Sequence, residues 1–191
     1  MKKQLVLCIV LLFLFCSPAL SLEANPVVKM TTSKGVIVIE LYRSKAPKTV
    51  DNFLMYVKQG FYNDTIFHRV IKNFMIQGGG LNSLMMQKAT GAQIINEADN
   101  GLRNLEGTIA MARTPLPHSA SSQFFINVKD NPFLDHRGKN SNDWGYCVFG
   151  KVIDGLNVVH AIENVPTGIR QGKKDVPLTP VIIESVTVVS G

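Results

Sequence analysis

The sequence predicts a mainly β protein of one domain, folded as a closed or nearly closed antiparallel barrel with helices over its ends. Short runs of β-branched and aromatic residues are spread along the chain, while only two segments have helical periodicity. These two segments lie early and late, so strands and helices do not alternate as in a doubly wound parallel sheet. No Pro/Ser-rich linker divides the 191 residues, which favours a single domain.

The first part of the barrel is predicted to be a hairpin followed by a helix. Residues 26–32 and 36–41 are β-branched runs joined by a Ser-Lys-Gly turn, the pattern of a β-hairpin. Pro47 suits the first turn of a helix, because the N–H that it lacks has no partner there. Gly60 ends this helix. The apolar residues at helical spacing are Val50, Phe53, Leu54 and Val57.

Further short strands are predicted on both sides of a polar, irregular stretch at residues 81–106. They cover residues 65–71, 74–77, 108–112, 123–128 and 147–152. A second helix is predicted over residues 155–164 from its apolar spacing. Residues 165–180 are rich in Gly and Pro and are predicted to form a loop, and residues 181–189 alternate as a closing strand.

The N-terminus has the pattern of an export signal. Two lysines precede an uncharged run over residues 5–16, which is shorter than the ~20 residues that a membrane span needs. Small residues at Ala19-Leu20-Ser21 offer a cleavage point. Residues 1–21 are therefore predicted to be a signal peptide, with an alternative end at residue 24, and residues 22–191 a single domain. An uncleaved N-terminal anchor is the alternative.

The charge pattern argues against a nucleic-acid-binding protein, and the cysteine content argues against a disulfide-stabilised one. Without residues 1–21 the chain has 170 residues, with 18 basic and 14 acidic side chains, so its net charge is +4 instead of +6. These charges are dispersed, without the basic stripe of nucleic-acid binders, and no nucleic-acid partner is expected. Only Cys147 remains, so there is no internal disulfide. Its apolar neighbours predict a buried side chain.

Motifs of cofactor, metal and nucleophilic chemistry are missing from the sequence. Gly78-Gly79-Gly80 lacks the Gly-Lys-Ser/Thr of a phosphate loop and opens no helix. The four histidines lie far apart, without a His-Glu-x-x-His pair. No Gly-x-Ser-x-Gly elbow surrounds the serines that follow His118. We therefore expect no cofactor and no metal.

Residues 67–77 combine a cation with apolar side chains. If residues 65–71 form one strand, Arg69 shares a face with Phe67 and Ile71. An arginine flanked by Phe and Met on a barrel wall would present its charge in a partly apolar hollow. From this pattern alone, an arginine paired with a carboxylate on the surface is an equally supported alternative.

Longer motifs stand in one order along residues 26–189. They are Phe67-His68-Arg69-Val70-Ile71, Phe74-Met75-Ile76-Gln77-Gly78-Gly79, Gly107-Thr108-Ile109-Ala110-Met111-Ala112-Arg113, Ser122-Gln123-Phe124-Phe125-Ile126, Phe133-Leu134-Asp135 and Val148-Phe149-Gly150-Lys151-Val152. In these motifs the sequence resembles the cyclophilins, which are peptidyl-prolyl cis-trans isomerases. The resemblance implies an eight-stranded closed antiparallel β-barrel capped by two α-helices.

The resemblance also implies an activity, rotation about Xaa-Pro peptide bonds, which breaks no covalent bond and needs no cofactor. Arg69 would be the catalytic residue, donating a hydrogen bond that is stronger in the twisted transition state. Gln77 would bind the substrate backbone and help to orient Arg69, with Gln123 as a second polar neighbour. The proline pocket would be lined by Phe74, Met75, Phe125 and Leu134. Other substrate-binding positions would be Ala112, Arg113, Phe133 and Tyr146.

Two positions depart from the large cyclophilins of eukaryotes, which have Trp at Phe133 and His at Tyr146. Phe offers apolar area but no indole N–H, which argues against strong inhibition by cyclosporin-type compounds. The segment at residues 135–145 is also longer, and its Trp144 is expected to cover the barrel rather than to reach the pocket. With the predicted signal peptide, these features resemble the bacterial periplasmic branch.

The expected protein is thus an exported, monomeric isomerase of the periplasm or the extracellular medium that assists folding of other exported proteins. Its partners would be unfolded or flexible polypeptides that contain proline, with no membrane contact after signal cleavage. The alternative is a cyclophilin barrel that binds proline segments as a module or chaperone with little turnover. Retention of Arg69, Phe74, Gln77 and Phe125 favours the enzyme.

Overall fold

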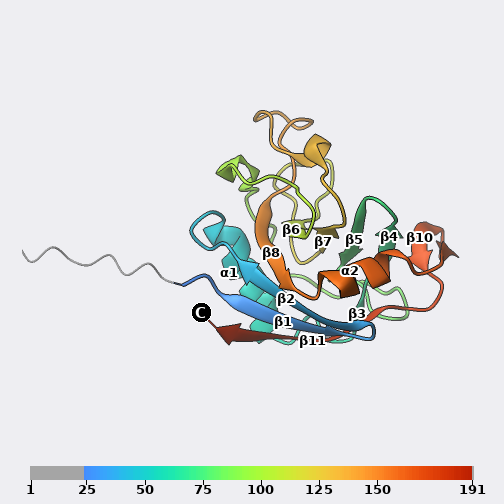
Figure 1. Ribbon diagram of the computed structural model, residues 1–191. Coiled ribbons are helices and arrows are strands. Elements are labelled where there is room, and N and C mark those ends of the chain that lie inside the picture. Colours follow the sequence, from blue (N-terminus) through green and yellow to red (C-terminus); the bar gives the residue numbers. More distant parts are fainter. Residues whose placement is uncertain (1–23, 191) are drawn as a thin grey trace, which may run out of the picture.

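The computed structural model describes residues 24–190, in which every strand pair is antiparallel (Figure 1). The elements are β1 (Val27–Thr32), β2 (Gly35–Leu41), α1 (Pro47–Lys58), β3 (Thr65–Ile66), β4 (Arg69–Ile71), β5 (Met75–Gly78), η1 (Ala98–Asn100), β6 (Thr108–Met111), β7 (Phe124–Asn127), η2 (Pro132–Leu134), β8 (Val148–Asp154), α2 (Leu156–Glu163), β9 (Thr167–Arg170), β10 (Lys173–Pro177) and β11 (Ile182–Ser190). The mainly β fold is as predicted. The predicted signal peptide, residues 1–21, lies outside the described residues.

The main sheet curls, in the strand order β3-β11-β1-β2-β8-β6-β7-β5-β4 (Figure 1). Its end strands, β3 and β4, are consecutive in the chain and separated only by Phe67 and His68. The N–H of Phe67 donates to the carbonyl of Val181 at 3.0 Å, so this segment bends from one end of the sheet to the other. The described residues show no ladder between β3 and β4, which differs in detail from the closed barrel predicted. If the two segments are counted as one bent strand, the predicted eight strands are present.

The two described helices, α1 and α2, pack against different strands. Helix α1 contacts β11, and α2 contacts β2, β4 and β5. The apolar stripe of α1 is buried as predicted, and Pro47 lies in its first turn. Gly155, which precedes α2, has a φ of +83°, and a Cβ there would lie 2.2 Å from the carbonyl oxygen of Val36. Only glycine fits this approach of the helix to β2. No helix within residues 24–190 is long and apolar enough to cross a membrane.

Side chains on the two faces of the sheet form separate apolar clusters. The larger cluster fills the barrel around Phe53, whose ring centroid lies 5.0 to 5.7 Å from those of Tyr62, Phe124 and Phe149. The second, smaller cluster lies on the other face of β5, β6 and β7 and includes Met75, Ala110, Phe125, Leu134 and Val148. Successive strand residues point to opposite faces. Phe124 therefore belongs to the barrel core and Phe125 to the second cluster.

Residues 165–180 were predicted to form a loop, and this prediction was wrong. They contain a hairpin of β9 and β10, with Lys173 opposite Arg170. Gln171 and Gly172 between them have φ values of +49° and +74°, which suits the tight turn of a two-residue hairpin. The strands carry exposed basic side chains and little apolar alternation, so the usual signal of a half-buried strand is missing.

Cys147 is buried and lies beside the Thr49 hydroxyl, with 3.5 Å between Sγ and Oγ1. Burial raises the pKa of the Cys147 thiol to about 12, so the thiol stays protonated at neutral pH. The predicted role as a small apolar side chain is confirmed. Trp144 packs against the barrel core, and its indole N–H donates to the carbonyl of Asn96 at 3.2 Å. It therefore covers the barrel, as expected.

A distant glutamate supplies the cap of α1. Ala46, at the N-cap position, makes no side-chain hydrogen bond, and the first turn contains no acidic residue. Instead, the Glu97 carboxylate accepts from the backbone N–H of Lys48 at 3.2 Å and of Thr49 at 2.8 Å. It also accepts from the Thr49 hydroxyl at 2.8 Å. A negative charge at this end is also favoured by the helix dipole.

We expect Glu97→Ala to lower the free energy of unfolding by about 1–2 kcal/mol, because it leaves two helical N–H groups without their acceptor. Glu97→Gln keeps an acceptor oxygen and removes the charge, so its loss should be smaller. Urea denaturation of the three proteins measures this. An unchanged midpoint and slope for Glu97→Ala would show that the cap contributes nothing.

Candidate active site

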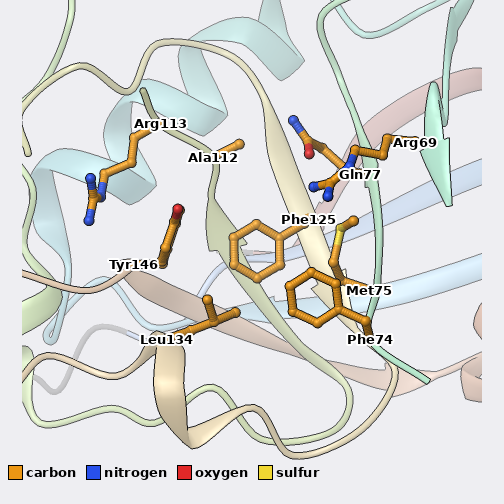
Figure 2. Close-up of a pocket in the computed structure, with 9 residues that line it drawn as sticks. All are labelled: Arg69, Phe74, Met75, Gln77, Ala112, Arg113, Phe125, Leu134 and Tyr146. Atoms are coloured by element: carbon orange, nitrogen blue, oxygen red, sulfur yellow. The ribbon is translucent and has the colours of Figure 1, made fainter. Parts of the chain in front are cut away.

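A cavity of about 120 Å³ opens on the second apolar cluster (Figure 2). Its lining residues are Arg69, Phe74, Met75, Gln77, Ala112, Arg113, Phe125, Leu134 and Tyr146. All of them belong to the predicted set of site residues. Gln123 and Phe133, the other two predicted positions, are not part of this lining.

Strand register places the central residues of the site in one row. Arg69 on β4 lies opposite Gln77 on β5, and Gln77 lies opposite Phe125 on β7. Phe125 is in turn opposite Ala110 on β6. Residues in such a row share a face of the sheet, and opposite side chains have Cβ atoms about 5 Å apart. The sheet thus sets a guanidinium beside an amide and an aromatic ring.

The face assignment of Phe67 was wrong. Phe67 is fully buried in the barrel core, 6.2 Å from Phe124 between ring centroids, and does not share a face with Arg69. The reason is the bend between β3 and β4, which interrupts the strand that the sequence pattern suggested. Ile71 does share the face of Arg69 and packs against the second cluster. Arg69 itself is part-exposed, with 43% of its side chain accessible.

Phe74 and Leu134 form part of the apolar lining of the pocket. Phe133, beside Leu134 in η2, is 60% exposed and stacks on Phe74 with ring centroids 5.6 Å apart. It therefore supports the outer side of the pocket instead of lining it. Phe125 meets the ring of Tyr146 edge-on at 5.6 Å on the opposite side. Both arrangements are favourable for aromatic pairs.

Three buried asparagines hold the wall of the pocket in place. The Asn131 side-chain amide donates to the carbonyl of Phe74 and to Asn127 Oδ1, at 2.9 and 2.8 Å. The Asn127 amide donates to Asn104 Oδ1 at 3.3 Å, and the backbone N–H of Asn104 donates to Asp135 Oδ1 at 2.7 Å. This chain joins the segments before β5 and after η2. Sequence reasoning missed it, because isolated asparagines have no periodic signal.

The polar side of the site is built from two glutamines. The Gln77 amide donates to Gln123 Oε1 at 2.9 Å, which fixes the orientation of both side chains. Gln123 thus touches the site through Gln77. Figure 2 shows the Gln77 amide and the Arg69 guanidinium close together above Met75.

Arg113 is directed away from Arg69 and along the other rim of the pocket (Figure 2). Its Nε donates to the carbonyl of Gly145 at 2.9 Å, and its guanidinium carbon lies 4.6 Å from the centroid of the Tyr146 ring. A guanidinium over an aromatic face is attracted by the ring quadrupole. Arg113 and Tyr146 therefore form one wall of the pocket, and the Arg113 guanidinium is held there by these contacts.

The charges near Arg69 come from β10. Arg69 Nε lies 3.8 Å from Asp175 Oδ2. A second cavity of about 500 Å³, lined in part by Arg69, His68, Lys173, Lys174 and Asp175, adjoins the first. Burial lowers the pKa of His68 to about 4, and the neighbouring charges of Lys173 and Arg69 add to the shift. His68 is therefore neutral at physiological pH.

Among residues 24–190, the site combines the Arg69 cation with an apolar pocket. No three His, Cys, Asp or Glu side chains of residues 24–190 gather into a metal-binding group. Such a pocket can bind a small apolar ring, exclude water from it, and offer charged N–H donors at its edge. Both alternatives left open by the sequence are present, because Arg69 faces an apolar hollow and also pairs with a carboxylate.

Comparisons with known proteins found matches over most of the chain. A protein-family model described as cyclophilin type peptidyl-prolyl cis-trans isomerase/CLD matches residues 27–188. The peptidyl-prolyl cis-trans isomerase cyp18 of Streptomyces antibioticus is 60% identical over 161 residues, which cover 84% of this chain and 97% of that protein. Peptidyl-prolyl cis-trans isomerase B of Escherichia coli is 59% identical over 157 residues, or 82% and 96% of the two chains.

A solved structure has the same fold. The crystal structure of a Cryptosporidium parvum cyclophilin type peptidyl-prolyl cis-trans isomerase matches with a TM-score of 0.72 and 30% identity, over 87% of this chain and 99% of that chain. The family model covers nearly all of the described residues, and the relatives match over almost their whole length. The chain therefore belongs to the cyclophilin family, and it is a peptidyl-prolyl cis-trans isomerase.

Proposed function

We propose that Arg69 is the catalytic residue of this isomerase and that the adjacent apolar cavity holds the proline ring of the substrate. The observation that carries the proposal is the row across β4, β5 and β7, which sets Arg69, Gln77 and Phe125 on one face. Phe125 and Met75 form the buried floor beneath the part-exposed guanidinium. A ring in the cavity would thus lie within reach of a charged donor.

The reaction requires stabilisation of a twisted amide. Resonance gives the C–N bond partial double-bond character, with a rotation barrier of about 18–20 kcal/mol. When the bond twists, conjugation is lost and the prolyl nitrogen gains a basic lone pair. An N–H of the Arg69 guanidinium can donate to that lone pair. This hydrogen bond is stronger in the twisted state than in the planar one, which is the condition for catalysis.

The hydrogen bond from Arg69 would supply a part of the acceleration, whose size follows from the usual strength of such bonds. A charge-assisted hydrogen bond contributes about 1.5–3 kcal/mol, which corresponds to roughly one to two decades of rate. The remainder would come from the pocket, which holds the proline ring while the preceding segment turns, and from removal of water around the amide. Gln77, fixed by Gln123, offers hydrogen bonds to the substrate backbone.

We expect Arg69→Ala to lower kcat/KM for an Ala-Pro peptide by roughly one to two decades or more, because the donor to the twisted amide is lost. Arg69→Lys should recover little, since a lysine lacks the planar, preorganised fork. Isomerisation rates measured by a protease-coupled assay or by NMR exchange test this. Unfolding midpoints would show that the fold is intact.

Two results would contradict the proposal. A wild-type rate no higher than the uncatalysed background would exclude the proposed mechanism, and peptide binding without turnover would favour the role of a proline-binding module. Activity retained in Arg69→Ala would leave the isomerase in place and remove Arg69 as its catalytic residue.

The proposed chemistry predicts a flat pH profile. The proposed donor is a guanidinium, a group that stays charged in proteins. His68, with its pKa of about 4, stays neutral from pH 6 to pH 8. We therefore expect kcat/KM to change by less than about twofold over this range, because the histidine beside the site does not change its charge there. A midpoint near 6.5 that disappears in His68→Gln would contradict this assignment.

We further propose that the protein is exported and acts on proline-containing segments of other exported proteins. The support is the N-terminal pattern of lysines, an uncharged run and small residues in the sequence. Rotation about Xaa-Pro bonds takes tens to hundreds of seconds without a catalyst, which is slow enough to limit folding after export.

Cell fractionation and mass spectrometry test export. We expect the protein outside the cytoplasm, with a mature N-terminus after residue 21 or residue 24, because the small residues there suit signal cleavage. A Ser21→Pro variant alters only the proposed cleavage point, and retention of residues 1–21 in it would locate the site. Secreted wild-type protein that still begins at Met1 would contradict cleavage.

A further inference from the structure

We propose that Asp175 is a positioning residue for Arg69, holding the guanidinium at the edge of the pocket through its Nε. The inference rests on the proposed role of Arg69. Asp175 Oδ2 lies 3.8 Å from Arg69 Nε, an ion pair slightly longer than a hydrogen bond. Within the described chain, Asp175 is the carboxylate that pairs with Arg69. It approaches from β10, which packs beside β4 (Figure 1).

The backbone at Asp175 is arranged to turn this side chain toward β4. Its φ is +60°, in the left-handed region that favours glycine. The register of the hairpin also shifts here, since Lys173 pairs with Arg170 whereas Val176 pairs with Gly168. Such a bulge turns the side chain of the extra residue and recurs next to active sites. A strained backbone persists where the surrounding structure imposes it, often at functional sites.

Neighbouring contacts fix Asp175 without the help of Arg69. Val176, the next residue, is buried in a small apolar cluster with Ile66, Leu81 and Met85. At the other end of the hairpin, the Gln171 side-chain amide donates to the carbonyl of Leu84 at 3.1 Å. The hairpin is thus anchored to the loop after β5. These contacts hold the backbone that carries the carboxylate, and we infer that the long arginine side chain is the part that Asp175 orders.

The contact at Nε has a specific consequence for the donors. Arginine has five N–H groups, and engagement of Nε leaves the terminal amino groups available for a substrate. The carboxylate also offsets repulsion, because Lys173 and Lys174 line the same cavity as Arg69. Without Asp175, three cations would surround this cavity, and the guanidinium would be displaced from the proline pocket. Asp175 is not placed to touch the reacting amide itself.

The first test replaces the carboxylate by its neutral isostere. Asp175→Asn removes the charge and keeps a residue type that tolerates the left-handed backbone. We expect kcat/KM for an Ala-Pro peptide to fall about two- to fivefold, the size that an exposed ion pair gives. Asp175→Gly removes the side chain without backbone strain, and it should show the same loss. Unchanged kcat/KM in both variants would overturn the proposal.

Asp64 provides a matched control. It is an exposed aspartate with a φ of +61°, and the described structure gives it no ion pair. Asp64→Asn and Asp64→Gly repeat the same changes of charge and backbone away from the pocket. We expect kcat/KM to stay at the wild-type value in both. A loss equal to that in the Asp175 variants would overturn the proposal, since any aspartate would then have the same effect.

Two further readouts separate positioning from a structural role. High salt should bring the kcat/KM values of the wild type and Asp175→Asn closer together, because salt screens both the exposed Arg69–Asp175 pair and the repulsion of Arg69 by Lys173 and Lys174. In an Arg69→Ala background, Asp175→Asn should cause no further loss, since coupled residues are not additive. Equal losses in both backgrounds would show that Asp175 acts on the fold. Failure of Arg69→Ala to lose activity would contradict the proposed function instead.

Discussion

The alternation of side chains along β4, β5 and β7 is the constraint on which the site depends. Val70, Ile76 and Phe124 face the barrel core, while their neighbours Arg69, Gln77 and Phe125 face the pocket. A slip of one residue in either ladder would exchange the two faces and bury the guanidinium. The apolar core therefore fixes the register, and the register fixes the row of site residues. Stability and chemistry are set by the same hydrogen-bond ladders.

Much of this site followed from the sequence because its residues lie in motifs that resemble those of the cyclophilins. Phe74, Met75, Gln77 and Phe125 belong to short runs whose order and spacing are those of the cyclophilin family, and all of them line the cavity. Phe124, next to Phe125 on the same strand, lies on the opposite face and in the core, as alternation along a strand requires. Phe133 lies outside the cavity, where it stacks on Phe74. Leu134, its neighbour in η2, lines the cavity in its place.

Two of the features that could not be predicted depend on contacts between distant segments, and a third lacks a periodic pattern in the sequence. Glu97 caps a helix that begins 50 residues earlier in the chain, and no local pattern in either segment indicates the other. At Phe67 the chain bends and donates a hydrogen bond to the carbonyl of Val181, which immediately precedes β11. The β9–β10 hairpin was missed because its strands are short, basic and exposed. For Glu97 and Phe67, tertiary contacts decided what the local pattern left open.

The position of β11 has a consequence for how the barrel is made. β11 pairs with β1 on one side and with β3 on the other, although it comes after all the other described strands. During synthesis from the N-terminus, the β1–β2 hairpin is made early. The outer edge of β1 then has no partner strand until β11 has been made. Joining the first strand to the last is a contact of high sequence separation, which slows folding through the entropy of loop closure. Completion of the barrel is thus tied to the arrival of Ile182–Ser190, and a nascent chain stays incompletely folded until then.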